Sequence, residues 1–401
     1  MIPPPSHNRE LSPGGDLVPG ASLDPAEPAA TPSLPPEAPE GEKPGETTVG
    51  SQYLAATPSL PPEAPAGISR SQILSGLILS VGISVAGLAA VFLILGDTFS
   101  WRKMAVFFCS HGVAAVALLW GSWLADSFRW WLFAVTLGGR LRWRDLLCIV
   151  LAGYFISGVT PFTSGGGPFK VYALSQHGLT VGQATAVVAA AGLVNQIVLA
   201  GGALLVTVAS DYTHQALGRR TDAAVYLYLG GLALFLGVVL NTDRFLRGMG
   251  SLGRWLGLSR WWTGERGSRI RQKVLRASTD FQEGLRLLLG HPGRLLLACL
   301  SNALFYLLFF SIAPVLLLGL GAHFPFWQAL GLQNVFWLLC TLMPTPGASG
   351  GAELGFVAVF IGRVPASLLP TLAMAWRLLT FYLRLLCGWP CFVAVLRRRR
   401  R

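Results

Sequence analysis

Apolar segments of about 20 residues, the length that crosses a bilayer as an α-helix, set the strongest limit on how this chain can fold. Six such segments occur, at 72–96, 104–125, 184–209, 223–241, 294–320 and 366–395. Only 12% of the residues are charged and 52% are hydrophobic, whereas an average soluble domain carries about 25% charged residues. The apolar side chains therefore face lipid, and the sequence predicts an all-α polytopic membrane protein of about six full spans.

Two further apolar stretches, 146–160 and 326–343, run into clusters of Pro and Gly that stop a helix. Both clusters read T-P-x-x-S-G-G, and a shorter helical stretch follows each, at 168–177 and 352–362. Interrupted helices in corresponding places of two halves are typical of repeat-built transporters. Because bare backbone is excluded from hydrocarbon, we expect two re-entrant or broken helices that belong to an inverted repeat.

Basic residues concentrate in three places between or after the spans: the loop 126–145, the loop 242–294, which carries eleven of them, and the end of the chain at 397–401. The positive-inside rule makes all three cytoplasmic. Both termini are then inside, and the two broken helices enter from opposite sides. Residues 268–290 have the pattern either of an amphipathic helix lying on the inner leaflet or of a solvated helix in the loop. Because this charge follows the span ends, we expect lipid partners and no nucleic acid.

The first 70 residues differ from the rest of the chain. They carry nine acidic and three basic residues, and AATPSLPPEAP at 29–39 returns at 55–65. Such a segment has too little apolar surface to offset the entropy of ordering. We therefore predict a disordered tail at 1–70, a membrane domain at 71–396 and a basic tail at 397–401. The long tail is either dispensable or a docking arm for a cytoplasmic protein.

A few charged residues inside the apolar part are candidates for function, because charge at membrane depth is costly. Lys170 follows the first break, Glu353 follows the second, and Arg377 and Arg384 lie seven apart in the last span. Cations beside helix N-termini suit a phosphate group. Glu353 neutralises this cluster when it is empty, or binds a proton or the amine of a head group, or is the fixed partner of Arg377. The full candidate set for substrate binding is Lys170, Glu353, Arg377, Arg384, Ser164, Gly165, Gly166, Ser349, Gly350, Gly351 and Asn195.

Other polar residues allow two interpretations. Asp126 and Arg129 close the span 104–125 and are spaced to pair with each other. Asn195, in the middle of a span, either lines a cavity or joins helices by hydrogen bonds. The six cysteines show no CxxC spacing, and P-loop, GxSxG and HExxH patterns are missing. We therefore expect no metal, no cofactor and no enzymatic activity.

Three parts of the sequence resemble the flippase-like membrane domain of lysylphosphatidylglycerol synthases and of stand-alone bacterial and archaeal proteins. They are Phe128-Arg129-Trp130-Trp131-Leu132, the segment 160–180 around Lys170, and Pro344 to Glu353 followed by Arg377 and Gly388. Lys170 stands where the family usually has Arg, and Ala191 to Gln196 lack the acidic residues often present there. The soluble aminoacyl-transfer domain of the synthases has no counterpart in the sequence, so lysyl transfer is not expected.

The resemblance implies translocation of a phospholipid or a polyprenyl-phosphate-linked lipid between the leaflets of a bacterial cytoplasmic membrane. The lipid would carry an anionic head group. Two alternatives stay open: a non-catalytic partner that anchors a lipid-modifying enzyme, and an integral-membrane lipid transferase. A homodimer is also compatible with the sequence.

Overall fold

The computed structural model describes residues 70–96, 110–209, 228–234, 237, 241, 265–341 and 343–398. All of them belong to the second of two units into which the chain divides, residues 57–401. They form helices and no strands, which confirms the predicted all-α fold. The predicted tail at 1–70 lies outside the described residues except for Arg70, and so do most of the predicted span 223–241 and residues 399–401.

Four helical segments within the described part are long and apolar enough to cross a membrane, and each matches a predicted span. They are α1 (Arg70–Leu95), α6 (Val181–Ala209), α12 with α13 (Pro292–Phe310 and Ile312–Gly319) and α16 with α17 (Leu369–Arg377 and Arg384–Arg398). The predicted span 104–125 corresponds to α3 (Ser110–Thr136), which continues well past residue 125.

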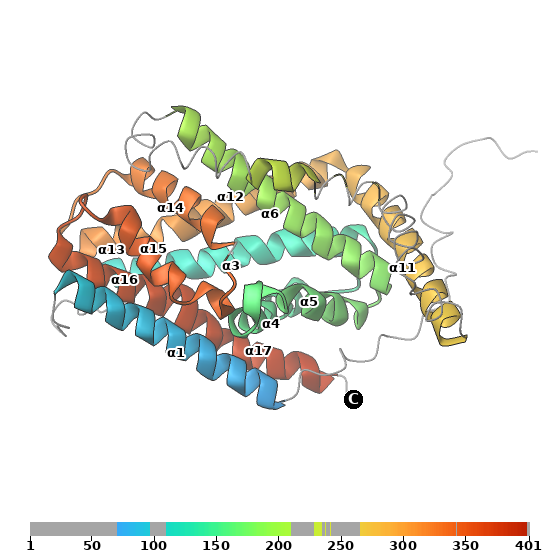
Figure 1. The fold of residues 1–401 in the computed structure, drawn as a ribbon. Helices are drawn as coiled ribbons and strands as arrows, with labels where there is room; N and C mark the ends of the chain where they lie inside the picture. Colours follow the sequence, from blue (N-terminus) through green and yellow to red (C-terminus); the bar gives the residue numbers. More distant parts are fainter. Residues whose placement is uncertain are drawn as a thin grey trace, which may run out of the picture. The chain divides into compact units, whose positions relative to one another are not determined.

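Each Pro/Gly cluster joins a pair of helices into a hairpin. The first hairpin consists of α4 (Trp143–Val159) and α5 (Gly166–Ser175), and the second of α14 (Phe326–Cys340) and α15 (Gly351–Phe360). At the base of the first hairpin the Arg140 N–H donates to the His177 carbonyl (3.2 Å). At the base of the second, Phe324 and Phe360 meet edge to face. The two predicted hairpins are present, and they point toward each other from opposite ends of α1 (Figure 1).

The duplicated T-P-x-x-S-G-G sequence folds into the same turn twice. Its third and fourth positions are left-handed in both copies, with φ of 53° and 53° in the first and 60° and 55° in the second, at Phe162, Thr163, Gly347 and Ala348. In each copy the N–H of the motif Ser donates to the carbonyl of the motif Pro at 3.1 Å. The copies diverge at this Ser, because Ser164 has a ψ of −26° and Ser349 a ψ of 146°. At the next residue Gly350 takes a φ of 84° where Gly165 has −73°.

The two breaks meet tip to tip. The Phe162 N–H in the first break donates to the Pro344 carbonyl just before the second (3.3 Å). Gly347 lies so close to its neighbours that an added Cβ would be 3.1 Å from the Gly158 carbonyl oxygen and 2.5 Å from the Phe381 ring. The sequence does not reveal whether the breaks touch, and the structure shows that they do.

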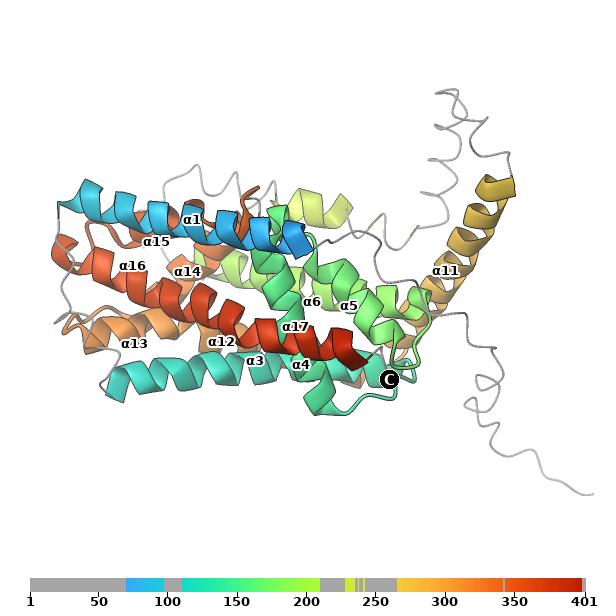
Figure 2. The same ribbon diagram turned by 90° about the horizontal axis from the view of Figure 1, so that it is seen from below.

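Helix α1 packs along both hairpins through two of its glycines. An added Cβ at Gly76 would lie 2.3 Å from the carbonyl oxygen of Val159, at the end of α4. One at Gly87 would lie 3.1 Å from the Cα of Gly350, at the start of α15. Small residues allow this close approach, as in many membrane helix pairs. In Figure 2 α1 runs beside α16, which it also contacts.

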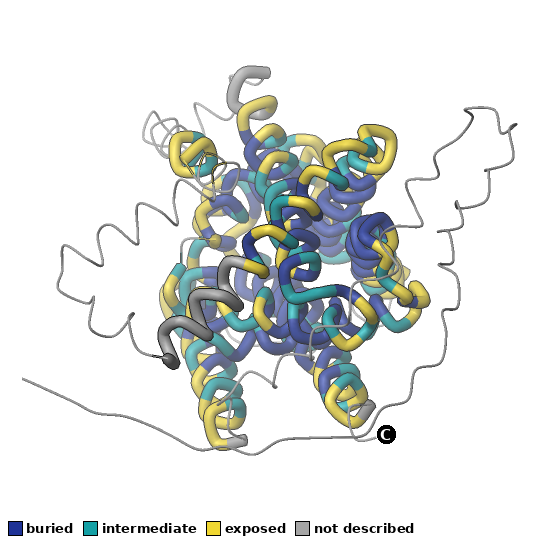
Figure 3. The backbone as a smooth tube through the Cα atoms, turned by 90° about the vertical axis from the view of Figure 1, so that its right-hand side faces the viewer, coloured by how far each residue is buried: buried dark blue, intermediate teal, exposed yellow. Residues whose placement is uncertain are grey.

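The buried side chains form two apolar clusters, one for each hairpin. The first hairpin and α6 share a cluster that includes Phe155, Leu174 and Val187, and the second hairpin shares one with α13 and α16 that includes Phe336 and Trp376. In Figure 3 the buried backbone lies inside a rim of exposed segments. Exposed leucines such as Leu93 and Leu296 face outward, as expected for helices that contact lipid.

The predicted amphipathic helix at 268–290 appears as α11 (Glu265–Leu289). Its position at the inner leaflet stays a prediction, but the apolar face of its C-terminal half does not contact lipid, because Phe281, Leu285 and Leu288 are buried in the protein. They pack with residues of α3 and α6, and Gly182 allows the backbone of α11 to approach α6 closely. The apolar face of this half is therefore covered by helices of the same chain.

Because Gly347 combines a left-handed φ with close neighbours, we predict that Gly347→Ala destabilises the protein by about 2 kcal/mol or more. Gly82→Ala is the matched control, since Gly82 has open space around its Cα and an ordinary helical φ. Thermal denaturation of both purified variants in detergent tests the prediction. An unchanged melting temperature for Gly347→Ala would show that the break relaxes without cost.

Candidate functional site

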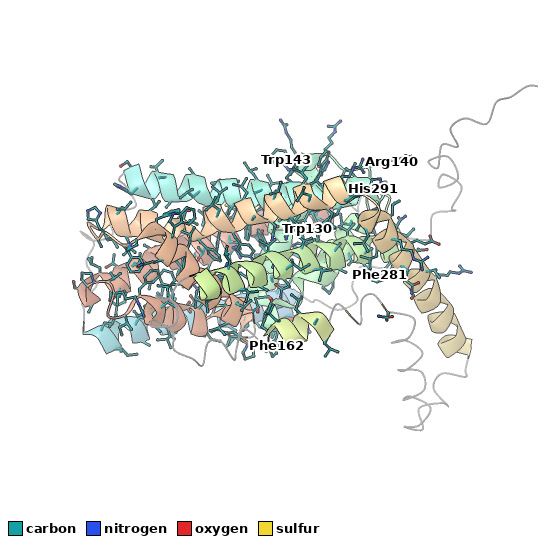
Figure 4. The ribbon with its side chains drawn as sticks, turned by 90° about the horizontal axis from the view of Figure 1, so that it is seen from above. Trp130, Arg140, Trp143, Phe162, Phe281 and His291 are labelled. Atoms are coloured by element: carbon teal, nitrogen blue, oxygen red, sulfur yellow. The ribbon has the colours of Figure 1, made fainter. Side chains whose placement is uncertain are left out.

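A cavity of about 810 Å³ lies between the two hairpins and the helices around them. Its volume is in the range of small-molecule sites. Four of the predicted site residues line it: Lys170, Asn195, Arg377 and Arg384. Glu353 is fully buried and does not line the cavity, but it forms an ion pair with Arg377, which does. Trp130, which also lines the cavity, lies among the helices in Figure 4, whereas Arg140 and Trp143 lie at the outer edge.

Glu353 and Arg377 form a buried ion pair that holds the second break in place. Arg377 Nε lies 2.7 Å from Glu353 Oε1, and Ser84 of α1 donates to the same oxygen. Glu353 Oε2 accepts the N–H of Gly350 (2.7 Å), which caps the start of α15. Arg377 also donates to Ser349 Oγ (2.9 Å) and to a backbone carbonyl of the turn (3.2 Å). The interpretation of Glu353 as the fixed partner of Arg377 matches this geometry.

Asp126 and Arg129 form a second buried ion pair. The pairing follows the sequence spacing, but the helix does not end at these residues, because α3 continues to Thr136. Asp126 also accepts the hydroxyl of Tyr154, and Arg129 donates to Asn302 Oδ1 on α12. Both carboxylate oxygens of Asp126 are thus bonded within the protein.

Lys170 reaches the cavity through a gap left by a glycine. An added Cβ at Gly153 would lie 2.5 Å from Lys170 Cε, so a larger residue at this position would push the side chain of Lys170 aside. The ammonium lies 4.0 Å from the centre of the Trp130 ring and 5.4 Å from that of Tyr154. Aromatic faces attract a cation at such distances. They stabilise the charge of Lys170 without neutralising it.

Arg384 lies in the same cavity but on the far side of a π-helical segment, Leu378–Leu383. In such a segment the hydrogen bonds run from i to i+5, so the two arginines, seven residues apart, are not spaced as on a regular α-helix. Arg377 reaches the second break, whereas the Arg384 guanidinium lies 4.6 Å from the centre of the Tyr154 ring and 5.7 Å from that of Phe309.

The cavity therefore has an excess of positive charge. Of the cations that line it, Arg129 and Arg377 are each paired with a carboxylate. Lys170 and Arg384 have no such partner within ion-pair distance among the described residues. The buried Nε of Arg384 has no hydrogen-bond partner either. Buried cations without counter-ions are costly, and an anionic ligand in the cavity would lower that cost.

Uncharged polar groups line another part of the cavity. Asn195 Oδ1 accepts the hydroxyl of Tyr306 (3.1 Å), and Asn195 Nδ2 donates to Gln196 Oε1 (3.1 Å). Both interpretations of Asn195 are thus compatible with the structure, because it links α6 to α12 and also lines the cavity. Among the described residues, no group of three or more His, Cys, Asp or Glu is placed to bind a metal ion.

Gly347 of the second break lines the cavity, but the six predicted Ser and Gly residues lie outside its lining: Ser164, Gly165, Gly166, Ser349, Gly350 and Gly351. The Gly165 N–H donates to Thr160 Oγ1 (3.0 Å), and the Gly350 N–H donates to Glu353, so both N–H groups are already bonded. Ser164 is exposed and donates to a turn carbonyl, and Ser349 is buried beside Arg377. Gly166 and Gly351 begin the second helix of each hairpin. A role for these six residues in binding stays a prediction.

Several residues at the site escape sequence reasoning. Tyr154 and Ser84 are single residues in long apolar helices, and nothing in the local sequence separates them from packing residues. Gly153 is one glycine among 47. Only the packing of distant helices reveals what these three residues contact.

We predict that Glu353→Gln destabilises the protein by about 3 kcal/mol, because it leaves the buried charge of Arg377 without its partner. The double variant Glu353→Gln, Arg377→Gln should lose less stability than the two single losses added together. Denaturation of the single and double variants in detergent measures the coupling, with Glu283→Gln on the exposed side of α11 as control. Strictly additive losses would contradict a coupled pair.

Comparison with known proteins places the chain in a family. A UPF0104 membrane protein from Archaeoglobus fulgidus is 24% identical over 281 residues, which cover 69% of this chain and 84% of that protein. No solved structure matches the chain. Residues 74–388 match the family model described as the lysylphosphatidylglycerol synthase TM region. The match spans both hairpins and the cavity between them, and this chain therefore belongs to the lysylphosphatidylglycerol synthase transmembrane-region family.

Proposed function

We propose that this protein moves a lipid with an anionic phosphate head group between the leaflets of a membrane, and that the head group binds in the cavity between the hairpins. The observation that carries the proposal is the pair of cations, Lys170 and Arg384, that line the cavity without a carboxylate partner among the described residues. The family supports a role connected with membrane lipids.

The arrangement of the hairpins suits passage from one leaflet to the other. They come from opposite ends of α1 and meet at their tips, beside the cavity. If the tips part from one side at a time, the cavity opens to one leaflet and then to the other, as in repeat-built transporters. In this scheme the hydrocarbon tails stay in the lipid and only the head group enters the protein.

The basic residues set the direction in which the protein sits in the membrane. Arg140, Arg142 and Arg144 at the base of the first hairpin would face the cytoplasm. This charge distribution supports the proposal that, in a bacterial cell, the protein lies in the cytoplasmic membrane with both termini inside. The sequence carries no nucleotide-binding motif, so the movement would be downhill or driven by protons or the membrane potential.

We further propose that no covalent step takes place in the cavity. A general base needs a group that is free to accept a proton. Both candidate carboxylates, Asp126 and Glu353, are buried and accept hydrogen bonds from an Arg and a hydroxyl group. Their geometry suits a structural role in holding Arg129 and Arg377.

Reconstitution in liposomes with fluorescent phosphatidylglycerol tests the proposal. Lys170→Ala and Arg384→Gln should each lower the rate of movement between leaflets by about 10-fold or more, since each removes a charged contact with the phosphate. Arg140→Ala is the matched control, because this exposed cation lies at the base of the same hairpin as Lys170. Equal rates for folded wild type and both cavity variants would refute the proposal.

A second variant is designed to displace the ammonium of Lys170 without removing its charge. Because a Cβ at position 153 collides with the Lys170 side chain, we predict that Gly153→Ala slows lipid movement although Lys170 is retained. Gly82→Ala, in open space on α1, should move lipid at the wild-type rate. A normal rate for Gly153→Ala would mean that the position of the ammonium is unimportant.

A further inference from the structure

We propose that the cavity also binds a small monovalent inorganic anion such as chloride, which takes the place of the lipid phosphate beside Lys170 and Arg384 when no lipid is bound. This anion is a second ligand of the cavity, and the inference rests on the proposed function only where the two ligands compete. Three observations carry it: the count of charges around the cavity, the surroundings of the two cations, and the volume of the cavity.

The charged side chains at the cavity leave two positive charges in excess. Its described part has four cations and two carboxylates: Lys170, Arg129, Arg377, Arg384, Asp126 and Glu353. Asp126 is bonded to Arg129 and also attracts Lys170 and Arg384. One carboxylate cannot balance three cations, however its charge is shared. A negative charge from outside the protein is therefore needed.

The two cations in excess lie among aromatic side chains. Lys170 is 9% exposed, and its ammonium lies 4.0 Å from the centre of the Trp130 ring. The Arg384 guanidinium lies near the rings of Tyr154 and Phe309, and its buried Nε has no hydrogen-bond partner in the described part of the chain. A lysine in such surroundings can give up its proton, but an arginine keeps its charge. A counter-ion beside Arg384 would lower the cost of that charge.

The cavity suits a small anion of one charge. Its volume of about 810 Å³ leaves room for an ion together with several waters, which keep part of the ion's hydration shell. The cost of removing an ion from water rises steeply with its charge. Chloride therefore enters more easily than a divalent anion such as sulfate or hydrogen phosphate.

The proposed transport cycle gives such an anion a role. After a head group has left, the hairpins must return to the first leaflet, and the cavity then carries two excess positive charges through a medium that disfavours them. Chloride from the water on either side would balance part of this charge. Because chloride and the lipid phosphate use the same two cations, each should exclude the other.

The melting temperature of the purified full-length protein in detergent tests whether the anion binds. Sodium chloride replaces sodium gluconate at constant ionic strength, so that general screening stays the same. We expect the melting temperature to rise saturably with chloride, by about 3 °C or more. A melting temperature that does not depend on the anion would overturn the inference, and so would stabilisation by sodium phosphate but not by chloride.

Two variants test where the anion binds. Lys170→Met and Arg384→Gln each remove one of the excess charges, so the rise with chloride should fall to less than about half of the wild-type rise. Arg140→Ala is the matched control, because this exposed cation lies at the base of the same hairpin as Lys170 and should leave the rise unchanged. If one cavity variant fails to fold, the other still tests the site. A full rise in a folded cavity variant would overturn the inference.

Binding of fluorescent phosphatidylglycerol in detergent measures the competition. Its dissociation constant should increase by about 5-fold when chloride replaces gluconate. The same constant in both salts would overturn the shared site.

Lipid movement in liposomes separates this inference from the proposed function. A melting temperature that depends on chloride through Lys170 and Arg384, in a protein that moves no lipid, would leave the anion site standing and refute the transport proposal. Lipid movement that Lys170→Ala and Arg384→Gln slow, in a protein that chloride does not stabilise, would do the reverse.

Discussion

The fold depends on how the chain satisfies the backbone of two helices that break among apolar neighbours. A break leaves N–H and C=O groups without helical partners, and hydrocarbon offers no replacement. Here Thr160 bonds the N–H of Gly165, and Glu353 bonds that of Gly350, while Arg377 donates to the carbonyl of Gly347. The ion pair of Glu353 and Arg377 therefore belongs first to the architecture, and it also places a cation at the cavity wall.

This double use explains the charge of the cavity. Each of the two carboxylates is bonded to an arginine and a hydroxyl, so their negative charges balance Arg129 and Arg377, and the charges of Lys170 and Arg384 remain in excess. The glycine at position 153 and the π-helical segment after Arg377 bring these two cations to the same space. The membrane-embedded charges thus divide into pairs that fix helices and cations that remain for a ligand.

Much of the architecture could be predicted from the sequence, because the length of an apolar segment and its interruption by Pro and Gly are visible in the local sequence. The duplicated motif marks both turns correctly, and the spacing of Asp126 and Arg129 indicates their pairing. The end of α3 could not be predicted, since its last two turns contain Trp and Phe that suit either a helix or an interface. The π-helical segment could not be predicted either, because nothing in the sequence of Leu378–Leu383 distinguishes i+5 from i+4 hydrogen bonding. Tyr154 and Ser84 acquire their roles only through contacts with distant helices.

The two turns share a backbone conformation but differ in how firmly they are held. The second is tied by side chains from α1, α15 and α16, and its third residue is a glycine enclosed by Phe381. The first has Phe162 at the same position with 59% of its surface exposed, and its side-chain hydrogen bonds stay within the hairpin. The pseudo-symmetric pair is thus mechanically unequal. Less free energy is needed to displace the first turn than the second, so access from its side should be the easier of the two.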